Sequence, residues 1–271
     1  MRITRICSLV RLAIAWLTMF LIGTELFVIS PMLPFLAADF RISPGVAGVS
    51  VTIFSVTYMV SAPVFGNIAD RVGRRRVLVS CLLTFAAANL LTASATNLAS
   101  LLAARLLAGA AVAGISPSVY ALVDDAAPSD RRATWLGVVV SGLLMALAFG
   151  ASAGALAGAR FGWAPVFVLL AISSLMLAWM NWEVWPDEAL SKDASDPQGK
   201  CRFVSAALVR RVAPTIIWSM GLYGVYTYLG AGLVTIGFSP GEIAEAILSY
   251  GCGAIAGVLM TSPRLVVRLE C

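Results

Sequence analysis

Apolar runs of about 20 residues recur along the whole chain and constrain its fold most. A helix of that length crosses the hydrocarbon core of a bilayer, and inside lipid every backbone polar group must be bonded within the protein. Of the residues, 60% are hydrophobic and only 12% are charged. The short alternating segments of a membrane β-barrel do not occur in the sequence. The sequence therefore predicts an all-α, polytopic membrane helix bundle.

The runs and the polar stretches between them predict eight spans in two unequal groups. We expect spans over 12–38, 44–66, 76–95, 98–122, 133–158, 164–184, 212–236 and 241–262. Residues 1–185 would form a six-helix bundle, and 212–271 would contribute two further spans. The segment 186–211 between them is rich in Pro, Ser and Asp, which is typical of a flexible linker.

Positive charges alternate between the two sides of the predicted spans. Of 19 Lys and Arg residues, sixteen fall in the N-terminus, in the 2–3, 4–5 and 6–7 connections and in the tail. Arg41 and Arg160 fall on the other side, and Arg105 lies inside a span. Because Lys and Arg favour cytoplasmic loops, we expect the N-terminus to be cytoplasmic. The net charge of +5 therefore reflects helix ends, and we expect no nucleic-acid partner.

The connection between the second and third spans carries a dense motif that consists of Gly66, Asp70, Arg71, Gly73, Arg74, Arg75 and Arg76. Its spacing resembles the G-x-x-x-D-R-x-G-R-[KR] pattern of the major facilitator superfamily, whose transporters join six helices to six more through a cytoplasmic linker. The resemblance implies a conformational switch in which Asp70 latches onto arginines such as Arg74 and Arg131. A simple cap of a helical hairpin is the alternative.

Two ionisable residues, Glu25 and Arg105, lie deep inside predicted spans. A charge near the bilayer centre costs on the order of 2.5–3.5 kcal/mol on insertion scales, so each should face a partner or a cavity. The two are candidates to pair if they lie at the same depth. Glu25 could instead be a structural carboxylate bonded to a neighbouring helix, and Arg105 could extend toward the interface.

The surroundings of both residues resemble bacterial drug and sugar efflux facilitators. Glu25 precedes a Pro31-x-x-Pro34 element, as in the first helix of that branch, and Arg105 is followed four residues later by Gly109. The resemblance implies that Glu25 serves proton coupling and substrate recognition and that Arg105 tunes this site. The usual Gln before the glycine is Ala108 here.

The fifth span carries small residues spaced four apart, which allow a neighbouring helix to approach closely. The pattern resembles the antiporter motif of exporters in the superfamily, with Ala155 where that motif has Pro. We expect this stripe to serve packing, gating or both. Its members are Gly142, Ala146, Gly150, Gly154 and Gly158.

The seventh span contains Tyr223, Tyr226 and Tyr228 in a segment that resembles sugar-efflux and chloramphenicol-resistance-like facilitators. Aromatic rings with hydroxyl groups suit a cavity wall that accepts both apolar and polar ligands, so Tyr226 and Tyr228 are candidate substrate residues. Anchoring at the membrane interface is the alternative.

The resemblances imply proton-coupled efflux of a small molecule, either a drug or a sugar-like compound, across a bacterial inner membrane. The expected partners are lipid, substrate and protons, with the proton gradient as energy source and no cofactor or metal; the chain has no histidine. An importer or uniporter, favoured by Ala155, and a non-transporting membrane scaffold are alternatives. An enzyme is disfavoured because the spans show no metal-ligand cluster or nucleophile motif. Because the sequence ends after its eighth span, we expect a truncated facilitator that does not transport alone.

Overall fold

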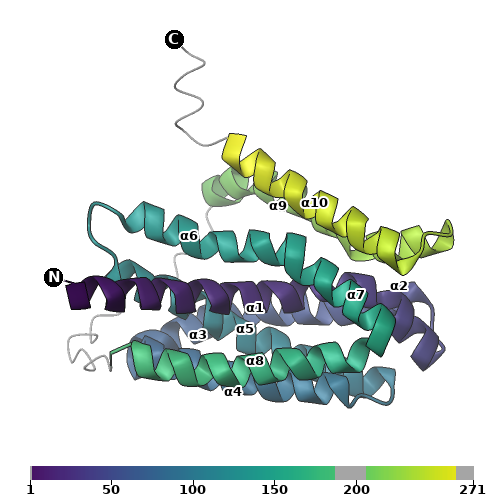
Figure 1. Ribbon diagram of the computed structural model, residues 1–271, viewed down its shortest axis with the longest axis horizontal. Helices are drawn as coiled ribbons and strands as arrows, with labels where there is room; N and C mark the ends of the chain where they lie inside the picture. Colours follow the sequence, from purple (N-terminus) through teal and green to yellow (C-terminus); the bar gives the residue numbers. More distant parts are fainter. Residues whose placement is uncertain (1, 187–205, 261–271) are drawn as a thin grey trace, which may run out of the picture.

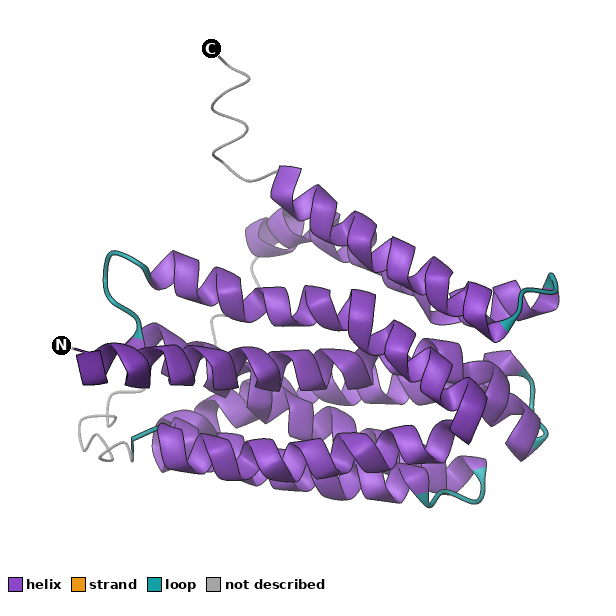
Figure 2. Ribbon diagram, viewed as in Figure 1, coloured by secondary structure: helices purple, strands orange, loops and turns teal. Residues whose placement is uncertain are grey.

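The computed structural model describes residues 2–186 and 206–260, which are almost entirely helical and contain no strand. Figures 1 and 2 show the helices lying roughly along one direction. The first six-span region comprises α1 (Arg2–Phe40), α2 (Pro44–Ala47), α3 (Val49–Val72), α4 (Arg74–Ala93), α5 (Leu98–Ala126), α6 (Arg132–Met145), the π-helix η1 (Ala146–Gly150), α7 (Ala151–Phe161) and α8 (Trp163–Val184). Two more helices follow, α9 (Ala206–Thr235) and α10 (Pro240–Met260).

The predicted membrane helix bundle is confirmed. Within the described residues, six helical stretches are long and apolar enough to cross a membrane, and they match the first six predicted spans: Ser8–Phe40, Pro44–Val72, Arg74–Ala93, Leu98–Ala126, Arg132–Phe161 and Trp163–Val184. Helices α9 and α10 stand where the seventh and eighth spans are predicted. Most of the predicted linker, residues 187–205, and the tail, 261–271, lie outside the described residues.

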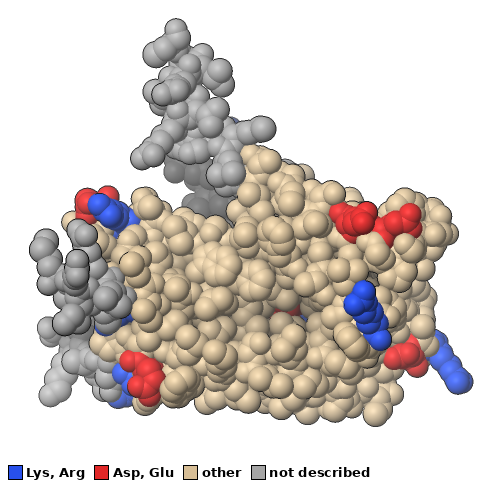
Figure 3. All heavy atoms as spheres, in the orientation of Figure 1, with Lys and Arg blue, Asp and Glu red and all other residues tan. Residues whose placement is uncertain are grey.

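Charged side chains gather at the two ends of the bundle and leave an uncharged belt between them (Figure 3). We call the end at which α1 begins the basic end, because it carries the arginines of the α3–α4 turn and the α5–α6 connection. The opposite end carries Asp39, Arg41, Arg160, Glu242 and Glu245. Large apolar side chains are exposed along the belt, as expected for a surface that faces lipid.

Helix α1 is the central element of the bundle. It packs against α5, α6, η1, α7, α8 and α9. In Figure 1, α4 and α8 lie on one side of α1 and α6 lies on the other, between α1 and α10, while α7 runs across α1 toward α8. Helix α10 contacts η1 closely at Gly251, where a Cβ atom would lie 2.6 Å from the backbone nitrogen of Ala148.

The small-residue stripe of the fifth span packs against α1. A Cβ atom would collide with Thr24 if added to Gly150, with Val28 if added to Gly154 and with Met32 if added to Gly158. Because both series advance by four residues, one ridge of α1 fits the smooth face of its neighbour along much of its length.

The fifth span is interrupted by the five-residue π-helix η1, which the sequence analysis missed. The helix axis changes direction between α6 and α7 (Figure 1). π-Bulges and prolines are both recognised causes of helix kinks. The bend therefore occurs although the position of the family's kink-forming proline holds Ala155.

Gly142 provides the sharpest test of this packing, because a Cβ atom there would lie 2.7 Å from the backbone oxygen of Trp16, which cannot rotate away. We expect Gly142→Ala to lower the free energy of unfolding by about 1–3 kcal/mol through overpacking. Denaturant unfolding in lipid–detergent micelles measures this loss. The matched control is Gly137→Ala on the same helix, where the added Cβ meets nothing within 4 Å. Equal stability of the two variants would contradict the close contact of α6 with α1.

Candidate functional site

The two ionisable residues predicted inside spans meet in the interior. Nη1 of Arg105, on α5, donates a hydrogen bond to Oε1 of Glu25, on α1, and both side chains are 0% exposed. They therefore lie at the same depth and form an ion pair. Extension of Arg105 toward the interface does not fit this arrangement.

The Arg105 guanidinium also lies over an aromatic ring that the sequence analysis did not single out. Its Cζ is 4.5 Å from the ring centroid of Phe54 on α3, a cation–π contact. A Cβ atom at Gly109 would strike the backbone carbonyl of Phe54. The glycine four residues after Arg105 thus lets α3 approach closely enough to place Phe54 against the cation.

The ion pair retains unused hydrogen-bonding capacity. Oε2 of Glu25 and both Nε and Nη2 of Arg105 are buried and have no hydrogen-bond partner among the described residues. Buried polar atoms are usually satisfied, and a buried ion pair with open valences contributes little net stability. The free carboxylate oxygen of Glu25 can accept a proton or a hydrogen bond. The free guanidinium nitrogens of Arg105 can donate hydrogen bonds to a polar group of a ligand.

Tyr226 of α9 bonds to α1 through a carbonyl that a proline leaves free. Pro31 has no N–H to donate to the carbonyl of Phe27 one turn earlier. The Tyr226 hydroxyl donates to this oxygen at 3.1 Å, and the Ser30 hydroxyl lies 2.6 Å from the Tyr226 carbonyl oxygen. Gly230 lets the helices approach, since a Cβ there would lie 3.1 Å from the Pro31 Cα. We call these five residues the α1–α9 clasp.

Tyr226 and Tyr228, predicted to line one cavity wall, have different surroundings. Tyr226 is 3% exposed and its hydroxyl is engaged in the clasp, whereas Tyr228 is 44% exposed. The Tyr228 hydroxyl lies beside Gly48, at the junction of α2 and α3. The reason is helical geometry, because residues two apart on a helix point to different sides.

The motif at the basic end connects several helices. Arg74 forms an ion pair with Asp125 of α5. It also lies 4.0 Å from Asp70, its predicted partner, which is a longer and weaker contact. Arg131 instead pairs with its neighbour Asp130 at 3.5 Å. Gly73 has φ 102°, a conformation that favours glycine, and it allows α4 to begin directly after α3. The space beside Gly66 is open, and Arg71 is exposed.

Arg75 of this motif caps the end of α8. Its Nη1 donates to the carbonyl of Trp185 at 2.9 Å, and its Cζ lies 4.0 Å from the ring centroid of Trp182. Arg11 donates from Nε to the neighbouring carbonyl of Val184 at 3.2 Å. Two cations thus satisfy the carbonyls at the negative end of the α8 dipole and tie α1, α4 and α8 together.

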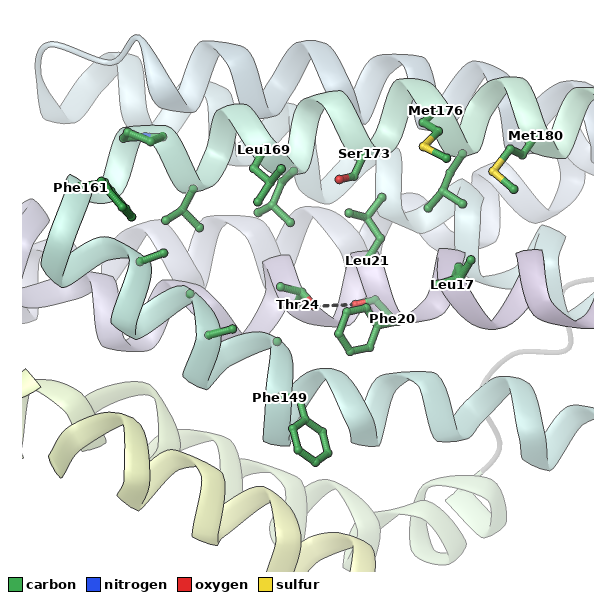
Figure 4. Close-up of a pocket in the computed structure, with 18 residues that line it drawn as sticks. Leu17, Phe20, Leu21, Thr24, Phe149, Phe161, Leu169, Ser173, Met176 and Met180 are labelled. Atoms are coloured by element: carbon green, nitrogen blue, oxygen red, sulfur yellow. Dashed lines mark hydrogen bonds between the residues drawn. The ribbon is translucent and has the colours of Figure 1, made fainter. Parts of the chain in front are cut away.

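A separate groove of about 830 Å³ lies between α1, the bent fifth span and α8 (Figure 4). Its walls include Leu17, Leu21, Phe149, Leu169 and Met176, and the figure shows those of α8 facing those of α1. The hydroxyl of Thr24 beside it is already bonded to the carbonyl of Phe20. The groove therefore offers apolar surface and little polar recognition.

Comparison with known proteins identifies the architecture. The model of the Major Facilitator Superfamily matches residues 15–270. The MFS-type transporter YwfA of Bacillus subtilis is 31% identical over 89% of this chain and 60% of its own length. The chloramphenicol resistance protein of Streptomyces lividans is 27% identical over 87% of this chain and 62% of its own length. The chain thus spans about three fifths of these relatives.

A solved structure, the D-xylose–proton symporter, shares the fold. It superposes with a TM-score of 0.70 at 17% identity and covers 91% of this chain and 66% of the symporter chain. At that identity the likeness establishes the arrangement of helices and nothing about the substrate.

The Glu25–Arg105 pair should show strong energetic coupling. We expect Arg105→Met to lower the free energy of unfolding by about 3–5 kcal/mol, because it leaves Glu25 buried without its partner. The double variant Glu25→Gln, Arg105→Met should recover part of this loss, since neither charge is left. Unfolding in lipid–detergent micelles of both single variants and the double variant measures the coupling. Strictly additive losses would show that the pair does not interact.

The α1–α9 clasp should hold α9 at the opposite end. We expect Tyr226→Phe to remove one hydrogen bond, worth about 0.5–1.5 kcal/mol, and to broaden the distance distribution between α7 and α9. Spin labels at the exposed Phe161 and Ile236 positions, with the native cysteines replaced, report this distribution in electron–electron resonance. Tyr228→Phe, which leaves the clasp intact, is the control. An unchanged distribution in Tyr226→Phe would show that the hydroxyl does not restrain the helices.

Proposed function

We propose that this chain, which belongs to the major facilitator superfamily and spans about three fifths of the length of these relatives, supplies the proton-binding part of a transporter for proton-coupled efflux of a small molecule across a bacterial inner membrane. The observation that carries the proposal is the fully buried Glu25–Arg105 pair with its unbonded carboxylate oxygen. A pair of this kind in the membrane interior is expensive, and such residues mark ion and substrate pathways.

In this proposal Glu25 carries the proton and Arg105 controls its affinity for it. A proton added to Glu25 neutralises the carboxylate and removes the attraction that ties α1 to α5. Release of the proton restores the pair. Phe54 keeps the guanidinium of Arg105 in place during both states through the cation–π contact.

The proposed orientation places the basic end in the cytoplasm, following the distribution of arginines. The motif with Asp70, Arg74 and Asp125 then lies on the cytoplasmic side, where it would act as a conformational switch. The clasp lies nearer the opposite end of α1, where it would hold the outer side closed. Gly142, Gly150, Gly154 and Gly158 would keep the bent fifth span packed closely on α1 while the two groups of helices rock.

The second candidate is an importer or uniporter of the same fold. Ala155, which stands in place of the antiporter proline, favours it. The bend at η1 weakens this argument, because the fifth span is kinked without the proline. The relative named as a chloramphenicol resistance protein is compatible with efflux.

Proton binding by Glu25 can be measured directly. In lipid nanodiscs, infrared difference spectra between acidic and alkaline pH should contain a protonated-carboxyl band from a water-excluded site. We expect Glu25→Gln to remove this band. Glu242→Gln, which alters an exposed carboxylate bonded to Ser239, should leave it intact. Persistence of the band in Glu25→Gln would rule out Glu25 as the proton carrier.

Flux of a fluorescent dye in everted membrane vesicles separates the transport alternatives. Movement that requires the proton gradient and is lost in Glu25→Gln supports coupled efflux. Movement independent of the gradient favours the uniporter. A titrating Glu25 without dye movement would remove efflux by this chain from the proposal and leave proton binding in place.

A further inference from the structure

The groove between α1, the bent fifth span and α8, which we call the lateral groove, owes its shape to the bend at η1. Helix α7 runs across α1 and packs against α8, which begins directly after Gly162, whereas α6 lies on the other side of α1. The lateral groove is therefore closed near Phe161, where α7 and α8 meet, and α1 forms its floor (Figure 4).

The lateral groove opens onto the surface that faces lipid. Three side chains along it are largely exposed, Phe161 at 72%, Leu169 at 63% and Met176 at 59%. On α8 the groove extends from Pro165 to Met180, which is about 22 Å at 1.5 Å per residue. The hydrocarbon core of a bilayer is about 30 Å thick, so one leaflet contributes about 15 Å. An acyl chain, which spans one leaflet, can therefore lie in the groove over its full length.

The walls of the lateral groove offer almost nothing to a polar occupant. None of its lining residues is charged, and only Thr24 and Ser173 have polar side chains. The Thr24 hydroxyl is already bonded to the carbonyl of Phe20, so Ser173, which points into the groove in Figure 4, supplies the remaining hydroxyl. The part of an occupant that enters the groove must therefore be apolar.

A cation stands at the closed end of the lateral groove. Arg160 lies in the last turn of α7, next to Phe161 and about one turn beyond Ala157, both of which line the groove. Its side chain is exposed and forms no ion pair with any of the described residues. Asp39, a carboxylate at the same end of the bundle, instead accepts a hydrogen bond from the indole of Trp163 at 2.7 Å. Arg160 is therefore available to an anion at the membrane surface.

We infer that the lateral groove binds one anionic phospholipid of the membrane, with an acyl chain along α8 and the phosphate beside Arg160. The apolar walls and the cation at one end match the two parts of such a lipid, and guanidinium groups bind phosphate through paired hydrogen bonds. The ammonium of phosphatidylethanolamine would bring a second cation close to Arg160, so the uncharged glycerol of phosphatidylglycerol is preferred. The acyl chain would fill the space that the bend at η1 leaves between α7 and α8.

Native mass spectrometry of the whole chain, delipidated in detergent and titrated with phosphatidylglycerol, measures the affinity for each lipid molecule bound. We expect the first molecule to bind more tightly than those that follow. Ala153→Leu on α7 and Ser173→Leu on α8 each add bulk inside the groove and should weaken this first binding by about tenfold through lost apolar contact. Ala159→Leu, the same change at an exposed position of α7 outside the groove, is the matched control and should bind like the unmodified chain.

The headgroup is tested with phosphatidylethanolamine that carries the same acyl chains. We expect Arg160→Gln to reduce the preference for phosphatidylglycerol by about threefold, as for an exposed ion pair. Equal affinity of the unmodified chain for the two lipids would overturn the assignment of Arg160.

The two groove variants lie on different helices, so the test survives if one of them fails to fold. First binding that is as tight in Ala153→Leu and Ser173→Leu as in Ala159→Leu would show unspecific lipid at the surface and overturn the inference. A dimer that Ala153→Leu dissociates would assign the groove to a second copy of the chain and would overturn it as well.

Discussion

The exclusion of water from the belt is the constraint on which the rest of the structure depends. A polar group inside lipid must find its partner within the protein, because none is available outside it. The Arg105 side chain meets Glu25 and the face of Phe54, and the carbonyl that Pro31 leaves free takes the Tyr226 hydroxyl. At the basic end, Arg75 satisfies a terminal carbonyl of α8. Each interaction joins helices distant in sequence, so satisfying polar groups also determines which helices lie together.

Much of this arrangement could be predicted from the sequence, because hydropathy and charge are local properties. The runs of apolar residues marked the helices, and the depth of Glu25 and Arg105 marked them as residues in need of partners. Their mutual contact required the relative depth of α1 and α5, which periodicity does not provide. Phe54 was missed for the same reason, since only the packing of α3 at Gly109 brings it beneath the guanidinium.

Two further features were beyond a motif-based prediction. The π-helix η1 contacts both α1 and α10, and its apolar residues, Ala146 to Gly150, are equally compatible with an ordinary helix. Tyr226 and Tyr228 are two residues apart and were predicted to share one site. In the structure Tyr226 belongs to the clasp, whereas the Tyr228 hydroxyl lies beside Gly48.

Helix α1 connects the proposed proton site to the contact with α9. Glu25 faces α5, the ridge of Thr24, Val28 and Met32 faces the glycines of the fifth span, and Phe27 and Ser30 face α9. Glu25 and Phe27 are two residues apart, or about 3 Å along the axis at 1.5 Å per residue. A helix is stiff over that distance, so a shift of α1 when the ion pair breaks would also displace its clasp residues, Phe27, Ser30 and Pro31. The protonation state of one carboxylate can therefore bias the position of α9 through a single rigid element, without a longer chain of contacts.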